Sequence, residues 1–143
     1  MVKTIPFSYT PLEHEREKAS NSYLMSLVAI MIGLPLPIIN LIATAIFFVG
    51  NRKATYFVRW HCIQALLSQL LTFAMNGVGV YWTLSIVLGT HTISNSYIAY
   101  LITIIGCNLI EFIATIYTSI KTRKGEHVEW WFFGSLVNVL CKQ

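Results

Sequence analysis

A long apolar run with a polar stripe is the feature that most limits how this chain can fold. The run extends from Cys62 to Leu88, directly after the charged and aromatic stretch Phe57–His61. A helix rises about 1.5 Å per residue and a bilayer core is about 30 Å thick, so about 20 apolar residues are enough to cross it. Polar side chains recur at steps of three and four residues, which places them on one side of a helix. They are His61, Gln64, Ser68, Thr72 and Asn76, with Gln69 alongside. The pattern predicts a membrane-spanning helix whose polar side faces other protein.

The composition also indicates a membrane protein. The 143 residues are 55% hydrophobic and 11% charged, whereas soluble domains are roughly a quarter charged. The net charge of +4 belongs to particular loops, and no basic patch with interleaved aromatic residues occurs, so we expect no nucleic-acid partner. Three widely spaced cysteines provide neither a disulfide framework nor a Cys-x-x-Cys site, and we expect no metal and no cofactor.

Three apolar segments predict an all-α integral membrane protein, a compact bundle of about three transmembrane helices. The spans cover about residues 23–50, 57–88 and 96–120, in one membrane domain of residues 23–143. The first contains Pro35 and Pro37, which lack an N–H and disrupt the preceding helical turn. Two structures fit this segment: a single kinked span, which we slightly favour, or a re-entrant hairpin of two half-helices.

Two shorter segments flank the predicted spans. Residues 1–22 are a polar lead-in that contains a short helix. Residues 129–141 include Trp130 and Trp131. As a helix, the apolar part of this segment would be only about 17 Å long, which is too short to cross a bilayer. We expect this segment to form an amphipathic helix on the membrane surface. The alternative is a fourth half-span packed into the bundle.

Basic residues predict the orientation in the membrane. They are Arg52, Lys53 and Arg59 near the first loop and Lys121, Arg123 and Lys124 after the third span. Positively charged loops stay in the cytoplasm, so we expect the loop Asn51–Arg59 and the C-terminal tail inside and the uncharged loop Gly89–Asn95 outside. The N-terminus lies outside if the first segment crosses once and inside if it is a hairpin. The loop and tail cations, with Trp130 and Trp131, are expected to anchor the protein at the lipid interface.

Glu111 stands out in the third span, where it shares a polar stripe with Thr115. A carboxylate near the bilayer centre carries an insertion penalty of about 2.5–3.5 kcal/mol, so it should face the bundle interior. Counted from the basic ends at about 1.5 Å per residue, Glu111, Gln69 and Asn40 lie at the same depth. We therefore predict one buried polar layer. It consists of Asn40, Gln69 (or Ser68 and Thr72) and Glu111.

That layer has two interpretations. It can relay a proton, an ion or a substrate, because an intramembrane carboxylate is a candidate functional group. It can also fix helix packing through interhelical hydrogen bonds of about 0.6 kcal/mol each. We favour the packing role, because the layer contains a single carboxylate and no lysine or arginine.

The stretch from Phe57 to Leu67, Phe-Val-Arg-Trp-His-Cys-Ile-Gln-Ala-Leu-Leu, resembles a family signature. With the preceding Asn51-Arg52-Lys53, it is similar to the hallmark of the small polytopic subunit of the chloroplast inner-envelope import translocon (the Tic family) and its bacterial relatives. Ile120-Lys121 and Lys124-Gly125-Glu126 resemble the family's second, basic motif. Trp60 replaces the usual phenylalanine, and Trp130-Trp131 replace an aromatic-proline pair. The resemblance implies a compact helical bundle and, for the chloroplast members, a part in a protein-conducting assembly, whereas for the bacterial members it implies no established activity. We expect the protein in a bacterial cytoplasmic membrane.

No side chains are arranged for hydrolysis or group transfer, and we expect no enzymatic activity. Arg59 can hold a lipid phosphate or a partner carboxylate. His61 and Gln64 can bond backbone groups freed at the Pro35/Pro37 break or in the C-terminal segment, so with Trp60 they would staple the bundle or dock a partner.

The expected function is that of an accessory or scaffold subunit of a larger membrane complex, linked to protein export, insertion or translocation. The alternative is a small channel or proton-coupled carrier that uses Glu111. The expected partners are the lipid bilayer and other integral membrane proteins, with self-association left open.

Overall fold

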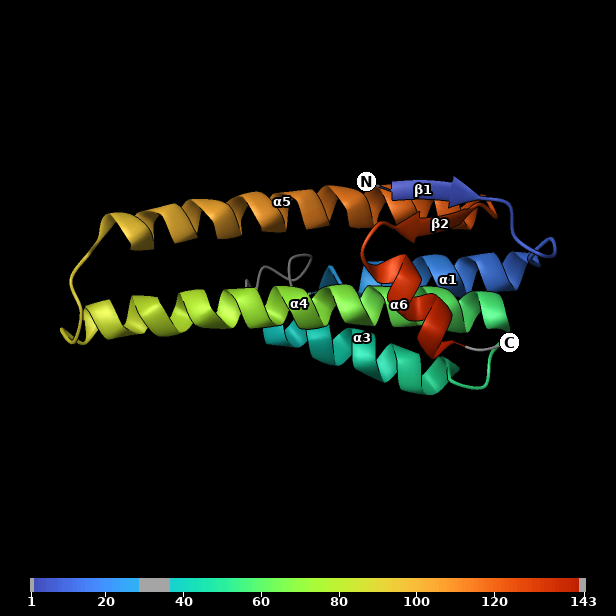
Figure 1. The fold of residues 1–143 in the computed structure, drawn as a ribbon. Coiled ribbons are helices and arrows are strands. Elements are labelled where there is room, and N and C mark those ends of the chain that lie inside the picture. The colour runs from blue at the N-terminus through green and yellow to red at the C-terminus, as the bar shows by residue number, and fades with distance from the viewer. Residues whose placement is uncertain (1, 29–36, 142–143) are drawn as a thin grey trace.

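The computed structural model describes residues 2–28 and 37–141, and this part of the chain forms five helices and one small sheet. In chain order the elements are β1 (Val2–Ile5), α1 (Glu13–Met25), α3 (Pro37–Asn51), α4 (Tyr56–Val87), α5 (Asn95–Arg123), β2 (His127–Trp130) and α6 (Phe133–Leu140). Figure 1 shows α4 and α5 as two long rods, with the other elements gathered around the start of α4 and the end of α5. We call that region the packed half and residues 76–108 the outer hairpin.

Two helices among the described residues, α4 and α5, are long and apolar enough to cross a membrane, by length and composition. With 32 and 29 residues they are about 48 and 44 Å long, more than a bilayer core requires. Only 11% of the most apolar window of either helix is buried inside the protein. Large apolar side chains such as Tyr81, Val87 and Ile105 are exposed along the outer hairpin. Such a surface suits contact with lipid tails.

The predicted first span, residues 23–50, is not a single helix. α1 ends at Met25, and α3 begins at Pro37, a position where the missing N–H of proline costs no hydrogen bond. Pro35 lies outside the described residues. α3 has 15 residues and is about 22 Å long, too short to cross. In Figure 1, α1 leads away from the packed end and α3 returns toward it. Among the described residues, two helices rather than three are long and apolar enough to cross a membrane, and the opposite directions of α1 and α3 favour the hairpin over the kinked span.

A small sheet joins the two ends of the chain, and the all-α prediction missed it. β1 pairs antiparallel with β2, with Val2 opposite Trp130 and Ile5 opposite His127. The predicted surface helix over 129–141 is accordingly shorter, because residues 127–130 belong to β2 and α6 begins only at Phe133. Four-residue strands show too little alternation to be recognised locally, and the two strands lie at opposite ends of the sequence.

A glycine turn places β2 against the helices. α5 ends at Arg123, with Lys124 as its C-cap, and Gly125 adopts a φ of +87°, a left-handed conformation that favours glycine. A Cβ at Gly125 would lie 2.9 Å from Cδ of Arg16, so the turn also packs closely on α1. The turn directs β2 back over the packed half, where Val128 becomes fully buried.

The packed half has an aromatic and polar core. One apolar cluster consists of Tyr23, Ala65, Val128 and Trp130, and a second consists of Trp60, Val137 and Cys141. His61 and Gln64 are fully buried as well. Because the sheet holds β1 against β2, the N-terminal strand, the loop that follows α3 and the C-terminal helix share one end of the molecule (Figure 1).

Candidate functional site

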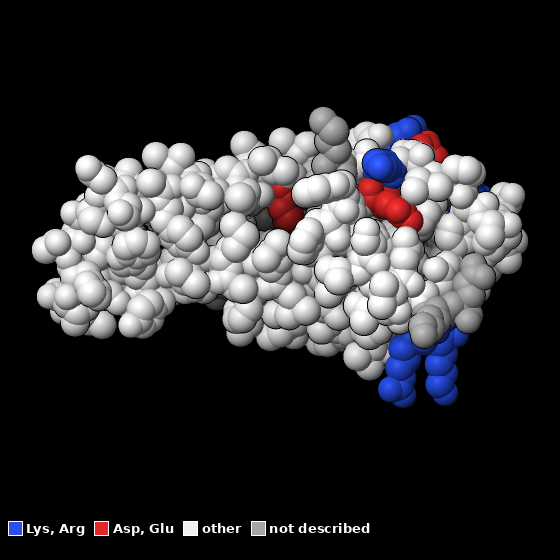
Figure 2. Space-filling view, viewed as in Figure 1, with Lys and Arg blue, Asp and Glu red and all other residues white. Residues whose placement is uncertain are grey.

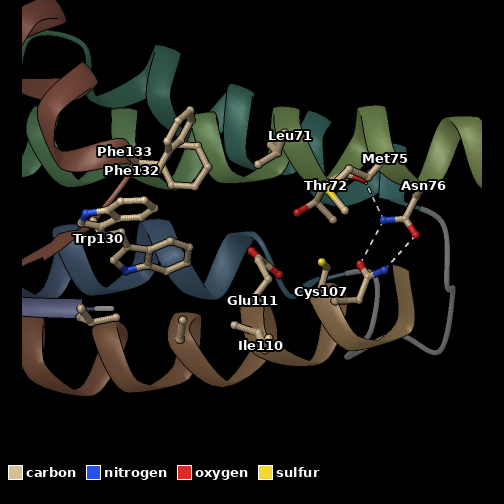
Figure 3. A pocket seen from close by; sticks show the side chains of 14 residues that line it. Leu71, Thr72, Met75, Asn76, Cys107, Ile110, Glu111, Trp130, Phe132 and Phe133 are labelled. Atoms are coloured by element: carbon tan, nitrogen blue, oxygen red, sulfur yellow. Dashed lines mark hydrogen bonds between the residues drawn. The ribbon is translucent and has the colours of Figure 1, made fainter. Parts of the chain in front are cut away.

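A lateral groove of about 340 Å³ lies between α4 and α5. Its walls are mostly apolar, with Leu71 and Met75 on α4 and Ile110 on α5, and aromatic side chains after α5 close the side toward the packed half. Figure 3 shows the Glu111 carboxylate between the two helices, pointing into this groove. On the space-filling view of Figure 2, one acidic group lies in a hollow near the middle of the molecule, and the other charged groups visible on this face lie at the packed end.

The Glu111 carboxylate is held through one of its two oxygens. Oε1 accepts hydrogen bonds from Ser68 Oγ at 2.8 Å and Gln69 Nε2 at 2.7 Å, both on α4, and from Thr115 Oγ1 at 3.2 Å, one turn along α5. Oε2 accepts none from the residues that the structure describes. The apolar wall of the groove therefore contains one carboxylate oxygen that has no donor within residues 2–28 and 37–141. It can accept a hydrogen bond when ionised and donate one when protonated.

The structure brings together most of the predicted polar layer. Ser68, Gln69 and Glu111 meet directly, and Thr72 lines the same groove. Asn40 is buried on α3, and it is not among the described side chains that donate to Glu111. Thr115 was left out of the layer, although its position four residues from Glu111 in the same stripe is the signal that would have included it.

Two asparagines link α4 and α5 at the outer side of the groove. Asn76 Nδ2 donates to Asn108 Oδ1, and Asn108 Nδ2 donates to Asn76 Oδ1, both at 3.0 Å. Within their own helices, Asn76 Nδ2 also donates to the Thr72 carbonyl (Figure 3), and Asn108 Nδ2 donates to the Ile104 carbonyl. Asn76 belongs to the predicted stripe, whereas Asn108 falls outside it and was missed.

A second polar network lies in the packed half and centres on Gln64. Its Nε2 donates to the Val128 carbonyl at 3.1 Å and to the Tyr23 hydroxyl at 2.8 Å, and its Oε1 accepts from the Trp130 N–H at 3.0 Å. Because two of these partners are backbone groups of fixed polarity, the orientation of the amide is determined. Gln64 thereby joins α4, α1 and β2.

That amide sets the direction of a longer chain of hydrogen bonds. Since the Tyr23 oxygen accepts from Gln64, its hydrogen is directed to His61 Nδ1 at 2.8 Å. His61 must then carry its hydrogen on Nε2, which donates to His127 Nδ1 at 3.2 Å. His127 Nε2, protonated in turn, lies 3.4 Å from Glu129 Oε1. Both imidazoles are neutral in this arrangement. Burial also lowers the pKa of His127, while Glu129 acts in the opposite direction.

Two tryptophans complete the packed half. Trp60 Nε1 donates to Asn138 Oδ1 on α6 at 2.7 Å, and Trp130 Nε1 donates to Thr118 Oγ1 on α5 at 2.7 Å. The prediction that both Trp130 and Trp131 anchor the lipid interface is wrong for Trp130, which is buried. Because residues alternate along a strand, Trp130 points inward, whereas Trp131 just after it is exposed.

The basic residues near the membrane interface separate into two groups. After α5, Lys121 pairs with Glu126 at 2.9 Å and Arg123 with Glu17 at 3.3 Å, while Lys124 is exposed. Around the α3–α4 loop, Arg52 and Lys53 are exposed and Arg59 is partly buried. Of the motif residues, Trp60, His61 and Gln64 are internal, so among them only Arg59 can reach an external ligand.

Residues 18–137 match the sequence profile of the magnetosome magnetite crystal formation protein family (MamF/MmsF). The chain belongs to that family. Comparisons with curated proteins and with solved structures gave no match.

Membership of the magnetosome family corrects the resemblance to the chloroplast import translocon, which is wrong. That resemblance depended on two short motifs, whereas the magnetosome family match covers most of the chain. The buried positions of Trp60, His61 and Gln64 show why the first motif misleads: these residues hold helices and a strand together, and such packing specifies a fold rather than an activity. The link to protein export, insertion or translocation loses its support. The membrane assignment stands, because magnetosome family membership agrees with the two long apolar helices.

Proposed function

We propose that the protein is a non-enzymatic accessory protein of the membrane in which its family supports magnetite crystal formation, and that it holds a partner membrane protein in the groove between α4 and α5. The observation that carries the proposal is the Glu111 carboxylate, which has three donors on Oε1 and none among the described residues on Oε2. The occupant that fits is a transmembrane helix of another protein, apolar along most of its length and carrying one hydrogen-bond donor at mid-membrane depth.

The setting of the groove favours such a partner. Lipid tails are as apolar as leucine side chains, so helices in a bilayer associate through close packing and interhelical hydrogen bonds. A polar atom that faces lipid without a partner is costly. A helix that fills the groove and donates to Glu111 Oε2 therefore gains both packing and a hydrogen bond. The exposed apolar side chains of the outer hairpin extend the contact surface on either side.

The distribution of basic residues supports an orientation of the protein in the membrane. The N-terminal strand, the loop after α3 and the C-terminal helix share one end, and Lys and Arg gather there in Figure 2. On the positive-inside rule, we propose that this end faces the cytoplasm and that the loop between α4 and α5 lies on the other side of the membrane.

The test is purification of the tagged full-length protein from its native membrane in mild detergent. We expect the wild type to bring down a membrane protein in constant stoichiometry. Leu71→Trp, which fills the groove without touching the Glu111 hydrogen bonds, should lose it. Thr103→Val is the control, because Thr103 lies on the exposed side of α5, away from the groove. Recovery of the protein alone, or only as a homo-oligomer, contradicts the proposal.

A second candidate function is a small channel or proton-coupled carrier, favoured by the same Oε2 atom. In liposomes that contain only this protein, a carrier should conduct protons, and Glu111→Gln should abolish the flux while the protein remains folded. Equal flux with wild type and Glu111→Gln excludes this candidate.

A further inference from the structure

A second pocket, of about 470 Å³, lies at the packed end where α3, α4 and α6 meet. Its apolar walls include Phe48 of α3, Ile63 of α4 and Val139 of α6. Two arginines also line it: Arg52, just after α3, and Arg59, in the first turn of α4. The volume is within the roughly 300–1,000 Å³ of typical small-molecule sites. The pocket thus combines an apolar surface with two guanidinium groups.

Neither arginine has an acidic partner among the described residues. The ion pairs recorded there involve Lys121, Arg123 and His127. Arg59 Nε is buried and makes no hydrogen bond within the described residues. Leaving a buried donor of a charged group without an acceptor is unfavourable. The Arg59 charge also acts on Cys141 across the pocket, where it partly offsets the rise in the pKa of that thiol on burial. The pocket is therefore positively charged and offers unused donors.

The position of the pocket matches the headgroup level of a bilayer. Arg59 lies one turn inside α4, which is about 5 Å from the helix start, and Arg52 lies in the preceding loop. Ile63 lies one turn deeper along α4, toward the hydrocarbon core. Val139 and Leu140 of α6 are 70% and 61% exposed. Cations at the interface above an apolar wall form the arrangement that an amphiphile with an anionic head would occupy.

We propose that Arg52 and Arg59 bind the phosphate of an anionic phospholipid, whose acyl chain lies along Ile63 and α6. The planar guanidinium group donates two parallel hydrogen bonds to a phosphate, a geometry that lysine cannot supply. A free phosphate ion shares this chemistry, but it would leave the apolar wall uncovered. The site is separate from the groove between α4 and α5, so it goes beyond the proposed function and can fail independently of it.

The experiment is lipid retention by the full-length protein, purified in detergent and studied by native mass spectrometry. The probes are phosphatidylglycerol, phosphatidylcholine and inorganic phosphate. We expect the wild type to retain one phosphatidylglycerol at least tenfold more than phosphatidylcholine, without displacement by millimolar phosphate. Arg52→Gln and Arg59→Gln should each reduce retention about tenfold. Arg59→Lys should also reduce it, because the charge remains but the two-donor geometry is lost.

Lys53→Gln is the matched control, since it removes the same charge next to Arg52 from a residue that does not line the pocket. It should change retention less than twofold. Equal losses in Lys53→Gln and Arg52→Gln overturn the site in favour of general surface attraction, and displacement by inorganic phosphate overturns the lipid assignment. Because Arg52 is exposed, Arg52→Gln keeps the test decisive even if an Arg59 variant fails to fold.

Discussion

The packed half and the outer hairpin belong to the same two long helices, yet they are stabilised in different ways. In the packed half, Trp60, His61 and Gln64 are completely buried, and between them they bond to α1, α6 and β2. In the outer hairpin, most large side chains face outward, and the polar contacts between helices are few, chiefly the Asn76–Asn108 pair.

This contrast shows which part of the structure is stabilised by contacts within the chain and which part depends on contacts with lipid or another protein. The packed half supplies its own partners for buried polar groups, so its geometry is specified by the sequence. The outer hairpin leaves its apolar surface to lipid or to another protein. Changes in the packed half should therefore affect stability most, and changes in the outer hairpin should affect it least.

The largest effect is expected for Gln64→Leu. The substitution leaves the Trp130 N–H and the Val128 carbonyl buried without their partner, and each such group costs about 1–3 kcal/mol. We expect a loss of about 3 kcal/mol or more in the free energy of unfolding, measured by denaturant titration in detergent.

The control for Gln64→Leu is Ser85→Ala, in the exposed part of the outer hairpin, where the serine hydroxyl bonds only to Tyr81 of its own helix. This variant should change stability by no more than about 0.5 kcal/mol. If the two substitutions lower the free energy of unfolding by the same amount, the packed half does not depend more on its own hydrogen bonds than the outer hairpin does, and the comparison fails.

A smaller loss is expected for Trp60→Phe. The ring stays buried, but the 2.7 Å hydrogen bond to Asn138 that holds α6 is lost, at a cost of about 1 kcal/mol. Asn138→Ala should lower the free energy of unfolding by a similar amount, and the double variant should lower it little more than either single substitution does. Strict additivity in this cycle would show that the hydrogen bond between Trp60 and Asn138 does not help to hold α6. Hydrogen exchange in α6 gives an independent measurement.

These hydrogen bonds also show how much of the molecule could be predicted from the sequence. Helix periodicity and apolar length predicted spans where α4 and α5 lie, and the polar stripe placed Ser68 and Gln69 at the depth of Glu111. The C-terminal segment was one expected partner of Gln64, but the strand residues that bond to it could not be predicted, because β1 and β2 are four-residue strands paired from opposite ends of the chain. For the same reason the sequence did not bring His127 to His61, since nothing local links a residue of β2 to the start of α4.

Acidification should weaken the packed half through His127. Its pKa is lowered by burial, so the neutral form is favoured in the folded protein, whereas the unfolded chain titrates near its ordinary value of about 6.5. The stabilising contribution is therefore present above that value and is lost as the pH falls toward the lowered pKa of the folded state. The groups that face His127 are His61 and Glu129, with the rings of Phe7 and Trp60 against it.

We therefore expect the unfolding midpoint to fall between pH 7.5 and pH 5, and to fall less in His127→Gln, whose amide does not titrate. Lys121 and Glu126 form a half-exposed ion pair at the same end, and Glu126→Gln serves as the control that should leave the pH dependence unchanged. If the unfolding midpoint depends on pH identically in the wild type and His127→Gln, protonation of His127 is not the cause of the loss of stability in acid.

The smallest effect is expected for the asparagine pair of the outer hairpin. Asn76→Leu or Asn108→Leu leaves one amide without its partner, and interhelical hydrogen bonds in membranes average about 0.6 kcal/mol with a maximum of about 1.7. Replacing both by leucine should be close to neutral, because no unpaired polar group remains and the new side chains can contact lipid or each other. A double-mutant cycle measured by the same denaturant titration tests this. If either single substitution costs as much as Gln64→Leu, the outer hairpin is held together by its own polar contacts rather than by its surroundings. The groove between α4 and α5 would then be a rigid feature of the isolated protein, and a partner helix would bind a preformed site instead of completing one.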